Sequence, residues 1–123
     1  MNNRIIEFRA WDKFEKKMIS WDECLNNEDL IPEILLNAVR YEPMQCTGLK
    51  DKNGRLIYEG DIVEHDTAAG PMRWAVLFRD GCFVLPYESG DAWLAKVIAY
   101  CPYESGVRVV GNIHEQGELL NEN

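Results

Sequence analysis

The sequence has few basic residues, and this shortage limits the partners that the protein can bind. Its 123 residues contain 13 Lys and Arg against 21 Asp and Glu, so the formal net charge is −8. Proteins that bind nucleic acids usually carry clustered Lys and Arg and have a high pI. The single basic cluster is interrupted by acidic residues, and it consists of Arg9, Lys13, Lys16 and Lys17. Direct binding to DNA or RNA is therefore disfavoured.

Long hydrophobic runs are absent from the sequence. No stretch approaches the ~18 apolar residues that a membrane-spanning helix requires. Residues 1–7 also lack the apolar region of a secretory signal peptide. We therefore expect a protein without a membrane span that stays in the cytoplasm.

Histidine and cysteine, the residues of most zinc sites, are also few. They are His65, His114, Cys24, Cys46, Cys82 and Cys101. No two cysteines have the C-x-x-C spacing, and neither histidine lies at a ligand spacing from a second pair of ligands. In a reducing cytosol such cysteines are expected to be free thiols. The sequence therefore predicts no metal and no cofactor.

The motifs of the common enzyme classes are missing as well. The glycines do not have the spacing of a phosphate-binding loop. His114 and Glu115 begin like the helix of a zinc protease, but Glu118 stands where that helix needs its second histidine. His65 next to Asp66 could form a catalytic pair with a cysteine, although no local signature marks one. We therefore expect a protein that is not an enzyme and has no catalytic residue, with an uncharacterised enzyme as the alternative.

One pair of carboxylates lies close enough in sequence to share a divalent ion. Glu59 and Asp61 flank Gly60. An aspartate in a turn commonly accepts hydrogen bonds from the backbone of that turn. We therefore interpret Asp61 as a turn residue rather than as a metal ligand.

The residues that are present indicate one mainly β domain that covers residues 1–123. Hydrophobic residues make up 46% and charged residues 28%, close to the average of globular domains, so the chain can bury a core. Alternation of apolar and polar residues predicts a hairpin over 4–21. Turn residues between apolar runs predict two further hairpins, over 44–65 and over 72–87. In the second of these, strand 73–78 pairs with strand 82–85. A last strand is predicted over 107–113.

Two stretches have the apolar spacing of short amphipathic helices, at 30–40 and 91–100. Asp29 is the expected cap of the first helix, whose apolar face consists of Ile31, Ile34, Leu35, Ala38 and Val39. Ser89 or Asp91 is the expected cap of the second, whose apolar face consists of Trp93, Leu94, Val97, Ile98 and Cys101. The region 22–43, which contains the first helix, could form a subdivision of the domain.

Four tryptophans are candidates for an aromatic surface that binds a partner protein. Trp74 lies within an apolar strand and is expected in the core. Trp11 and Trp21 end the strands of the first hairpin and are the better candidates for exposure.

Three blocks of the sequence have a recognisable pattern. The first reads EFRAWD at 7–12, the second reads QCTGLKDKNG at 45–54 and IYEGDIV at 57–63, and the third reads VGNIHE at 110–115. Together the blocks cover about 7–19, 44–64 and 108–120, and they closely resemble the YopX family. Members of this family are small proteins encoded by bacteriophages and prophages.

The resemblance implies a fold of coiled, bifurcated antiparallel sheets with a small barrel-like region around residues 60–63. It also implies self-assembly into homo-oligomers. It transfers no activity, cofactor or catalytic residue to this chain. The variable stretches 22–43 and 88–106 lie between the blocks, so the resemblance does not bear on the two expected helices.

We therefore predict a phage or prophage accessory protein that binds another bacterial or phage protein in the host cytoplasm. The first alternative is a nucleic-acid-associated protein that uses Arg9, Lys13, Lys16 and Lys17. The second alternative is an acidic inhibitor of a host nucleic-acid enzyme, although the net charge is spread along the chain rather than gathered in dense acidic runs.

Overall fold

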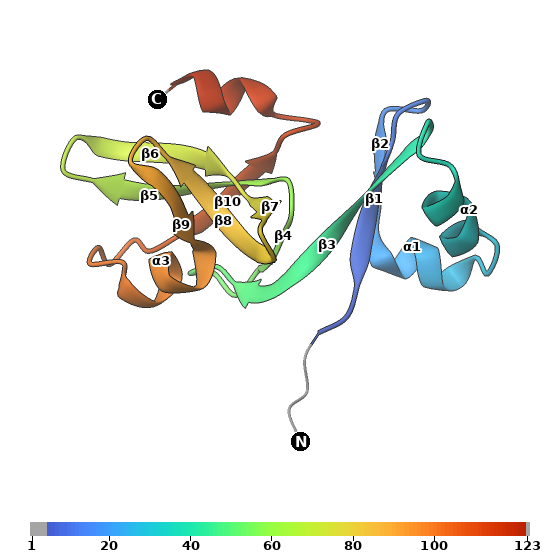
Figure 1. Cartoon of the computed structure of the whole chain (residues 1–123), viewed down its shortest axis with the longest axis horizontal. Helices are drawn as coiled ribbons and strands as arrows, with labels where there is room; N and C mark the ends of the chain where they lie inside the picture. The colour runs from blue at the N-terminus through green and yellow to red at the C-terminus, as the bar shows by residue number, and fades with distance from the viewer. Residues whose placement is uncertain (1–4, 123) are drawn as a thin grey trace. The chain divides into compact units, whose positions relative to one another are not determined.

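The computed structural model describes residues 5–122. The chain is mainly β, with antiparallel sheets and short helices (Figure 1), as the sequence predicts. It divides into two compact units, unit 1 (Met1–Cys46) and unit 2 (Thr47–Asn123). The division falls inside strand β3 (Tyr41–Lys50), after the region 22–43 for which a subdivision is suggested by the sequence.

Unit 1 is a small sheet with two helices. Strand β1 (Phe8–Asp12) lies between β2 (Lys17–Ile19) and β3 and is antiparallel to both, with Ala10 opposite Ile19 and Pro43. The core consists of Ala10, Ile19, Cys24, Ile34 and Tyr41. The hairpin expected over 4–21 is confirmed from Phe8 to Ile19, while residue 4 lies outside the described residues.

Helix α1 (Trp21–Asn26) replaces the end of the expected hairpin. The hydroxyl of Ser20 accepts a hydrogen bond from the backbone N–H of Glu23 at 3.2 Å, and the Glu23 carboxylate accepts one from the backbone N–H of Ser20 at 3.3 Å. These two bonds form a capping box, which satisfies N–H groups that have no partner within the helix. The prediction that the returning strand continues to Trp21 is therefore wrong.

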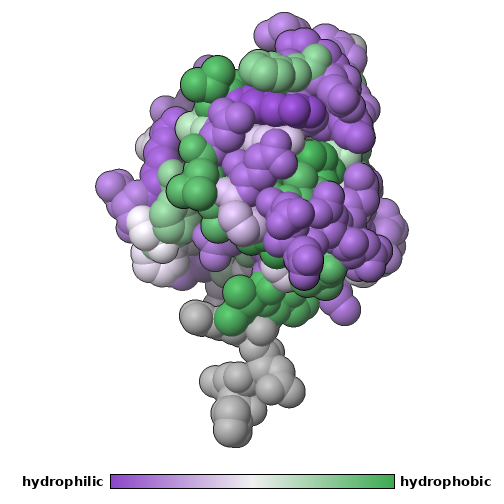
Figure 2. Space-filling view, turned by 90° about the vertical axis from the view of Figure 1, so that its right-hand side faces the viewer, coloured by the Kyte–Doolittle hydropathy of each residue, from purple (hydrophilic) through white to green (hydrophobic). Residues whose placement is uncertain are grey.

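Helix α2 (Leu30–Leu36) is shorter than the helix expected over 30–40. It ends at Leu36, and Asp29 occupies the cap position without a side-chain hydrogen bond. Ile34 is buried, but Leu35, Leu36 and Val39 are 59%, 86% and 76% exposed. Figure 2 faces the side of α1 and α2 and shows apolar surface among hydrophilic surface. The apolar face predicted for this helix is therefore only partly buried.

The Asp12 carboxylate joins the β1–β2 turn to the start of β3. It accepts hydrogen bonds from Arg40 Nε at 3.1 Å and Arg40 Nη2 at 2.9 Å, and from the backbone N–H groups of Phe14 and Glu15. The bonds from the Arg40 guanidinium lower the pKa of Asp12 to about 2. This carboxylate is almost fully covered by protein, so the ion pair fixes the turn in place.

Asp12 is expected to make unit 1 sensitive to acid. Its pKa is lower in the folded chain than the ordinary value of 3.8, so its contribution to stability is complete above about pH 4 and is lost as the pH falls toward 2. Asp12→Asn removes this titration. Urea unfolding of the wild type and of Asp12→Asn near pH 6, 4 and 2 measures the free energy of unfolding of each. The difference between the two free energies should shrink as the pH falls. A difference that stays constant over this range would contradict the role of Asp12.

Unit 2 consists of two three-stranded antiparallel sheets, with short elements beside them. One sheet has the order β10 (Arg108–Asn112), β5 (Asp61–Thr67), β6 (Gly70–Ala75). The other has the order β7 (Leu77–Arg79), β8 (Cys82–Tyr87), β9 (Gly90–Trp93). Strand β4 (Leu56–Tyr58) pairs with β3, and helix α3 (Leu94–Tyr100) and the 3₁₀ helix η1 (Gly117–Glu122) complete the unit.

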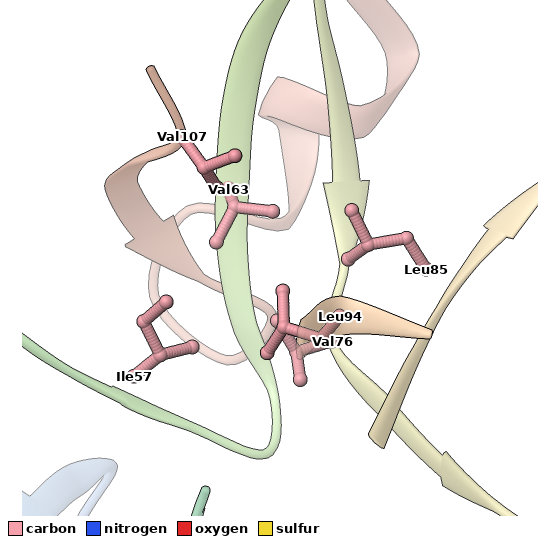
Figure 3. Close-up of a cluster of buried hydrophobic side chains, with 6 residues drawn as sticks. All are labelled: Ile57, Val63, Val76, Leu85, Leu94 and Val107. Carbon is pink, nitrogen blue, oxygen red and sulfur yellow. The ribbon is translucent and has the colours of Figure 1, made fainter. Parts of the chain in front are cut away.

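The two sheets of unit 2 surround one hydrophobic core (Figure 3). Its buried members are Ile57, Val63, Val76, Leu85, Leu94 and Val107, and they come from β4, β5, β8, α3 and the segments between strands. Side chains from both sheets thus share one interior, as in a small barrel. The barrel-like region expected around residues 60–63 lies here.

Val76 divides the strand expected over 73–78 into two. Its N–H donates to the carbonyl of Asp61, and its carbonyl accepts from the N–H of Gly60, both at 2.8 Å. The chain changes sheets at this point, so β6 pairs with β5 and only β7 pairs with β8. The predicted hairpin is confirmed for Leu77–Arg79 with β8, but its extension to residue 73 is wrong.

The helix expected over 91–100 starts later than predicted. Residues 90–93 form β9, in which Ala92 lies opposite Leu85, and the helix begins at Leu94. Asp91 makes an ion pair with Arg79 at 3.0 Å instead of capping the helix. Trp93 stands at the cap position without a side-chain cap bond, so neither Ser89 nor Asp91 has the expected role.

The tryptophans are placed differently from the sequence prediction. Trp11 is only 8% exposed, because its strand is paired on both sides. Trp21 is half-buried and packs edge-on against Phe8, with ring centroids 5.0 Å apart. Trp74, expected in the core, packs against the core of unit 2 but is only half-buried.

Among the described residues, no helix has both the length and the apolar character needed to cross a membrane.

Candidate functional site

The surface of unit 2 contains a groove of about 610 Å³ with an aromatic lining. We call it the aromatic groove, and its floor consists of His65, Thr67, Met72, Trp74, Pro86 and Tyr87. His65 lies opposite Met72 in the β5–β6 pair, so alternation along the strands places both on the same face as Thr67 and Trp74. Strand β8 contributes Pro86 and Tyr87 from the second sheet. Three strands therefore build the groove.

The aromatic rings of the groove contact one another and are joined by a hydrogen bond. His65 stacks on Trp74 with ring centroids 4.4 Å apart, and Tyr87 contacts Trp74 edge-on at 4.9 Å. The Nε2 atom of His65 lies 2.7 Å from the Tyr87 hydroxyl, and its Nδ1 atom lies 2.9 Å from the carbonyl oxygen of Asp66. A carbonyl only accepts, so Nδ1 carries a proton and, in the neutral ring, Nε2 accepts the hydroxyl proton of Tyr87. The rings thus form a preorganised surface.

The hydroxyl of Tyr87 is held in its protonated form. Burial raises the pKa of Tyr87, and the nearby thiol of Cys101 raises it further. A tyrosine already titrates near pH 10, far above neutral pH. The Tyr87 hydroxyl therefore keeps its proton at neutral pH and can donate it to Nε2 of the neutral His65 ring.

The charged residues of β5 lie on the face opposite His65. Glu64 accepts hydrogen bonds from Arg108 at 2.6 Å and from Arg73 at 2.8 Å, and the pKa of Glu64 is lowered mainly by the bond from Arg108. Asp66 accepts a hydrogen bond from the hydroxyl of Ser105 at 2.5 Å. These contacts tie β5 to its neighbours and leave an uncharged floor in the groove.

His65 and Tyr87 also line a smaller hollow of about 160 Å³ beside α3. Cys101 lines the same hollow, so the structure brings a cysteine near the His65–Asp66 pair that the sequence singled out. However, both ring nitrogens of His65 already have hydrogen-bond partners within the chain. This arrangement favours a positioning role for His65 over proton transfer from the thiol.

The other residues that the sequence singled out have structural contacts. Asp61 accepts a hydrogen bond from the backbone N–H of Tyr58 at 2.8 Å, which confirms its interpretation as a turn residue. The cysteines are free thiols, as expected, with Cys24 and Cys46 buried. Within residues 5–122, no group of three or more His, Cys, Asp or Glu is arranged to hold a metal ion.

The basic cluster of the first hairpin does not form an open stripe. Arg9 is 8% exposed, Lys13 donates to the carbonyl of Ala38 at 3.0 Å, and Lys17 lies 3.6 Å from the carboxylate of Glu15. Only an array of accessible cations can neutralise several phosphates at once. Lys16 is exposed, but a single exposed cation beside three engaged or buried ones offers little attraction for a polyanion.

We predict no specific binding to duplex DNA. The reason is the net charge of −8 together with the engaged side chains of Lys13 and Lys17. A mobility-shift titration against random and phage-derived duplexes at about 150 mM salt should show no sequence-dependent retardation. Retardation at nanomolar protein that depends on the DNA sequence would contradict this prediction.

The aromatic groove was not predicted from the sequence. The turn at 68–69 that joins β5 to β6 has no strong hairpin signal, so the pairing of His65 with Met72 could not be inferred. The sequence feature that could have indicated the groove is the occurrence of Trp74, Pro86 and Tyr87 within the hairpin predicted over 72–87, because aromatic residues are enriched at binding surfaces.

The chain was compared with known protein families and structures. The family model described as YopX protein matches residues 7–121. The chain belongs to the YopX family. This confirms the resemblance carried by the three sequence blocks. A search of the curated proteins finds no match.

Two solved structures of similar proteins support the YopX fold. Protein EF1440 from Enterococcus faecalis is 28% identical, with a TM-score of 0.69 over 96% of this chain and 99% of that one. Protein yopX from Bacillus subtilis is 19% identical, with a TM-score of 0.59 over 98% of this chain and 99% of that one. The similarity to the second protein concerns the fold alone. This YopX-family chain thus matches both proteins over nearly their whole length.

Proposed function

We propose that this YopX-family protein is a phage or prophage accessory protein that acts without catalysis by binding another protein in the bacterial cytoplasm. The observation that carries this proposal is the aromatic groove, in which His65, Trp74 and Tyr87 hold one another in place. Aromatic side chains that are fixed before binding are typical anchors of protein interfaces, because little conformational entropy is lost. The volume of about 610 Å³ suits a peptide segment rather than an ion.

The chemistry of the groove fits a proline-rich segment of the partner. A polyproline II helix makes no internal hydrogen bonds, so it needs apolar packing and donors for its carbonyl groups. Grooves lined by aromatic rings recognise such segments. Trp74 supplies a ring and an indole N–H that no hydrogen bond between described residues uses. Ser89 adds a hydroxyl group to the lining of the groove.

Charge favours a basic residue next to the prolines. Glu88 borders the groove, is exposed, and makes no ion pair with another described residue. The net charge of −8 attracts a cationic segment over longer distances. The proposed ligand is therefore a proline-rich segment flanked by Arg or Lys.

Calorimetric titration of the full chain tests this proposal. The probe is a peptide of about twelve residues with a P-x-x-P core and a flanking Arg, and the comparison peptide has alanine in place of proline. We expect the proline peptide to bind, and Trp74→Ala to weaken binding at least about tenfold. The matched control is Trp93→Ala, which removes a tryptophan that is 55% exposed and lies outside the groove. The proposal would be overturned if the two peptides bound with equal affinity, or if Trp74→Ala and Trp93→Ala lost equal affinity for the proline peptide.

We also expect the protein to form homo-oligomers. The resemblance to the YopX family implies self-assembly, and β7 and β9 are the edge strands of their sheet in unit 2. Edge strands present backbone groups that can pair with a second chain. Light scattering coupled to size exclusion at micromolar concentration should give a mass above the 14.2 kDa of the monomer. A monomer over a wide concentration range would refute this expectation.

A further inference from the structure

Unit 1 presents an exposed apolar segment where α2 ends. Leu35, Leu36 and Val39 are 59%, 86% and 76% exposed, and Ala38 is exposed as well. We call residues 35–39 the apolar segment. Ile34 of the same amphipathic pattern is buried and Ile31 is partly buried, but the apolar side chains of the segment are exposed. Adjacent exposed side chains of this size are typical of interaction sites.

Hydrogen bonds hold the apolar segment in one conformation. The N–H of Asn37 donates to the carbonyl of Glu33 at 3.0 Å, and the carbonyl of Asn37 accepts from the N–H of Tyr41 at 3.0 Å. Lys13 Nζ donates to the carbonyl of Ala38 at 3.0 Å. The segment is therefore fixed before any partner arrives, so binding orders few residues.

The surroundings of the apolar segment are acidic. Residues 18–39 contain no Lys or Arg, and their five carboxylates belong to Asp22, Glu23, Glu28, Asp29 and Glu33. Glu33 accepts a hydrogen bond from the Tyr41 hydroxyl at 3.2 Å, and Glu23 belongs to the capping box. None of the five makes an ion pair with another described residue. Apolar side chains and uncompensated negative charge thus occur in the same helical region.

We infer that the α1–α2 region binds a basic protein surface whose Lys and Arg residues surround an apolar patch. Leu35, Leu36 and Val39 supply the apolar contact, and the five carboxylates attract the cations of the partner. Pairing with a second copy of the same region is disfavoured, because it brings two sets of five carboxylates together with few cations nearby: Lys13 beside the segment, and Arg40, which is already paired with Asp12. This partner surface differs in chemistry from the proline-rich segment proposed for the aromatic groove.

A designed helical peptide with a leucine face and a lysine face is the probe for this inference, and a leucine–glutamate peptide of the same pattern is the comparison. We expect the full-length protein to bind the lysine peptide only. The double variant L36S/V39S should weaken this binding at least about tenfold, although it leaves the charge unchanged. The matched control Phe78→Ser removes a side chain that is 50% exposed in unit 2 and should leave binding unchanged.

Further outcomes separate this inference from the alternatives. Trp74→Ala should leave binding of the lysine peptide unchanged, so failure of the groove proposal and failure of this one are distinguishable. Equal binding of L36S/V39S and the wild type would mean general attraction between charges and would overturn the inference. It would also be overturned if L36S/V39S abolished self-association, because a second copy would then cover the segment.

Discussion

Replacing Asp51 by alanine is expected to destabilise the folded protein by about 3 kcal/mol, because hydrogen bonds to a charged group contribute about 1.5–3 kcal/mol each and are not fully additive. Asp51 is 7% exposed. It accepts hydrogen bonds from the backbone N–H groups of Asn53, Arg55 and Val109, each at 2.9 Å. One side chain thus closes the 50–55 turn and ties it to β10, 58 residues along the chain.

Urea unfolding of Asp51→Ala and of two comparison variants measures this effect. Asp51→Asn keeps one acceptor oxygen and should lose less stability than Asp51→Ala. Glu104→Ala is the matched control, because Glu104 is exposed and makes no ion pair or side-chain hydrogen bond with a described residue. This control should change stability by no more than about 0.5 kcal/mol. Equal midpoints for Asp51→Ala and Glu104→Ala would contradict the role of Asp51.

Gly54→Val is expected to cost about 1–3 kcal/mol, because a β-branched residue resists a positive φ. Gly54 has a φ of 84°, and nothing lies within 4 Å of the position of an added Cβ atom. The cost therefore comes from backbone strain and not from a collision.

Gly117→Val is the matched control for this substitution. The space around Gly117 is equally open, but its φ is outside the left-handed region. Both variants replace glycine by valine, so the effect on the unfolded chain is similar in the two. Gly54→Val should unfold at a lower urea concentration than Gly117→Val. Coinciding midpoints would mean that the turn tolerates a side chain at residue 54.

The two substitutions are not independent. The N–H of Gly54 donates to the carbonyl of Asp51 at 3.0 Å, so both residues belong to one turn. Residues that share a network usually show coupled effects on stability. The double variant Asp51→Ala/Gly54→Val should therefore lose less stability than the sum of the two single losses.

This turn also shows which parts of the fold the sequence could predict. The strand pairing around residues 50–55 follows from Asn53 and Gly54, whose preferences are local. The capping box of Ser20 and Glu23 is also local, and helix α1 could have been found from it. Features decided within a few residues are thus accessible from the sequence.

The errors arise where distant residues decide the structure. The strand expected over 73–78 is interrupted because Val76 bonds to Gly60 and Asp61 in a separate part of the chain. Trp11 is buried because two other strands flank its own. The aromatic groove depends on His65, Trp74 and Tyr87 from three strands, and no spacing in the sequence indicates that these residues meet.

Strand β3 contains the boundary between unit 1 and unit 2. Its residues Tyr41–Gln45 pair with β1, and its later part pairs with β4, so the division after Cys46 falls inside a strand. Boundaries between compact regions usually lie in exposed linkers. A cut at the boundary would leave residues 41–46 with β1 and residues 47–50 with β4, but it would break the one strand that the two pairings share. An insertion between residues 46 and 47 would therefore interrupt a continuous strand, and we expect it to be tolerated less well than an insertion in an exposed loop.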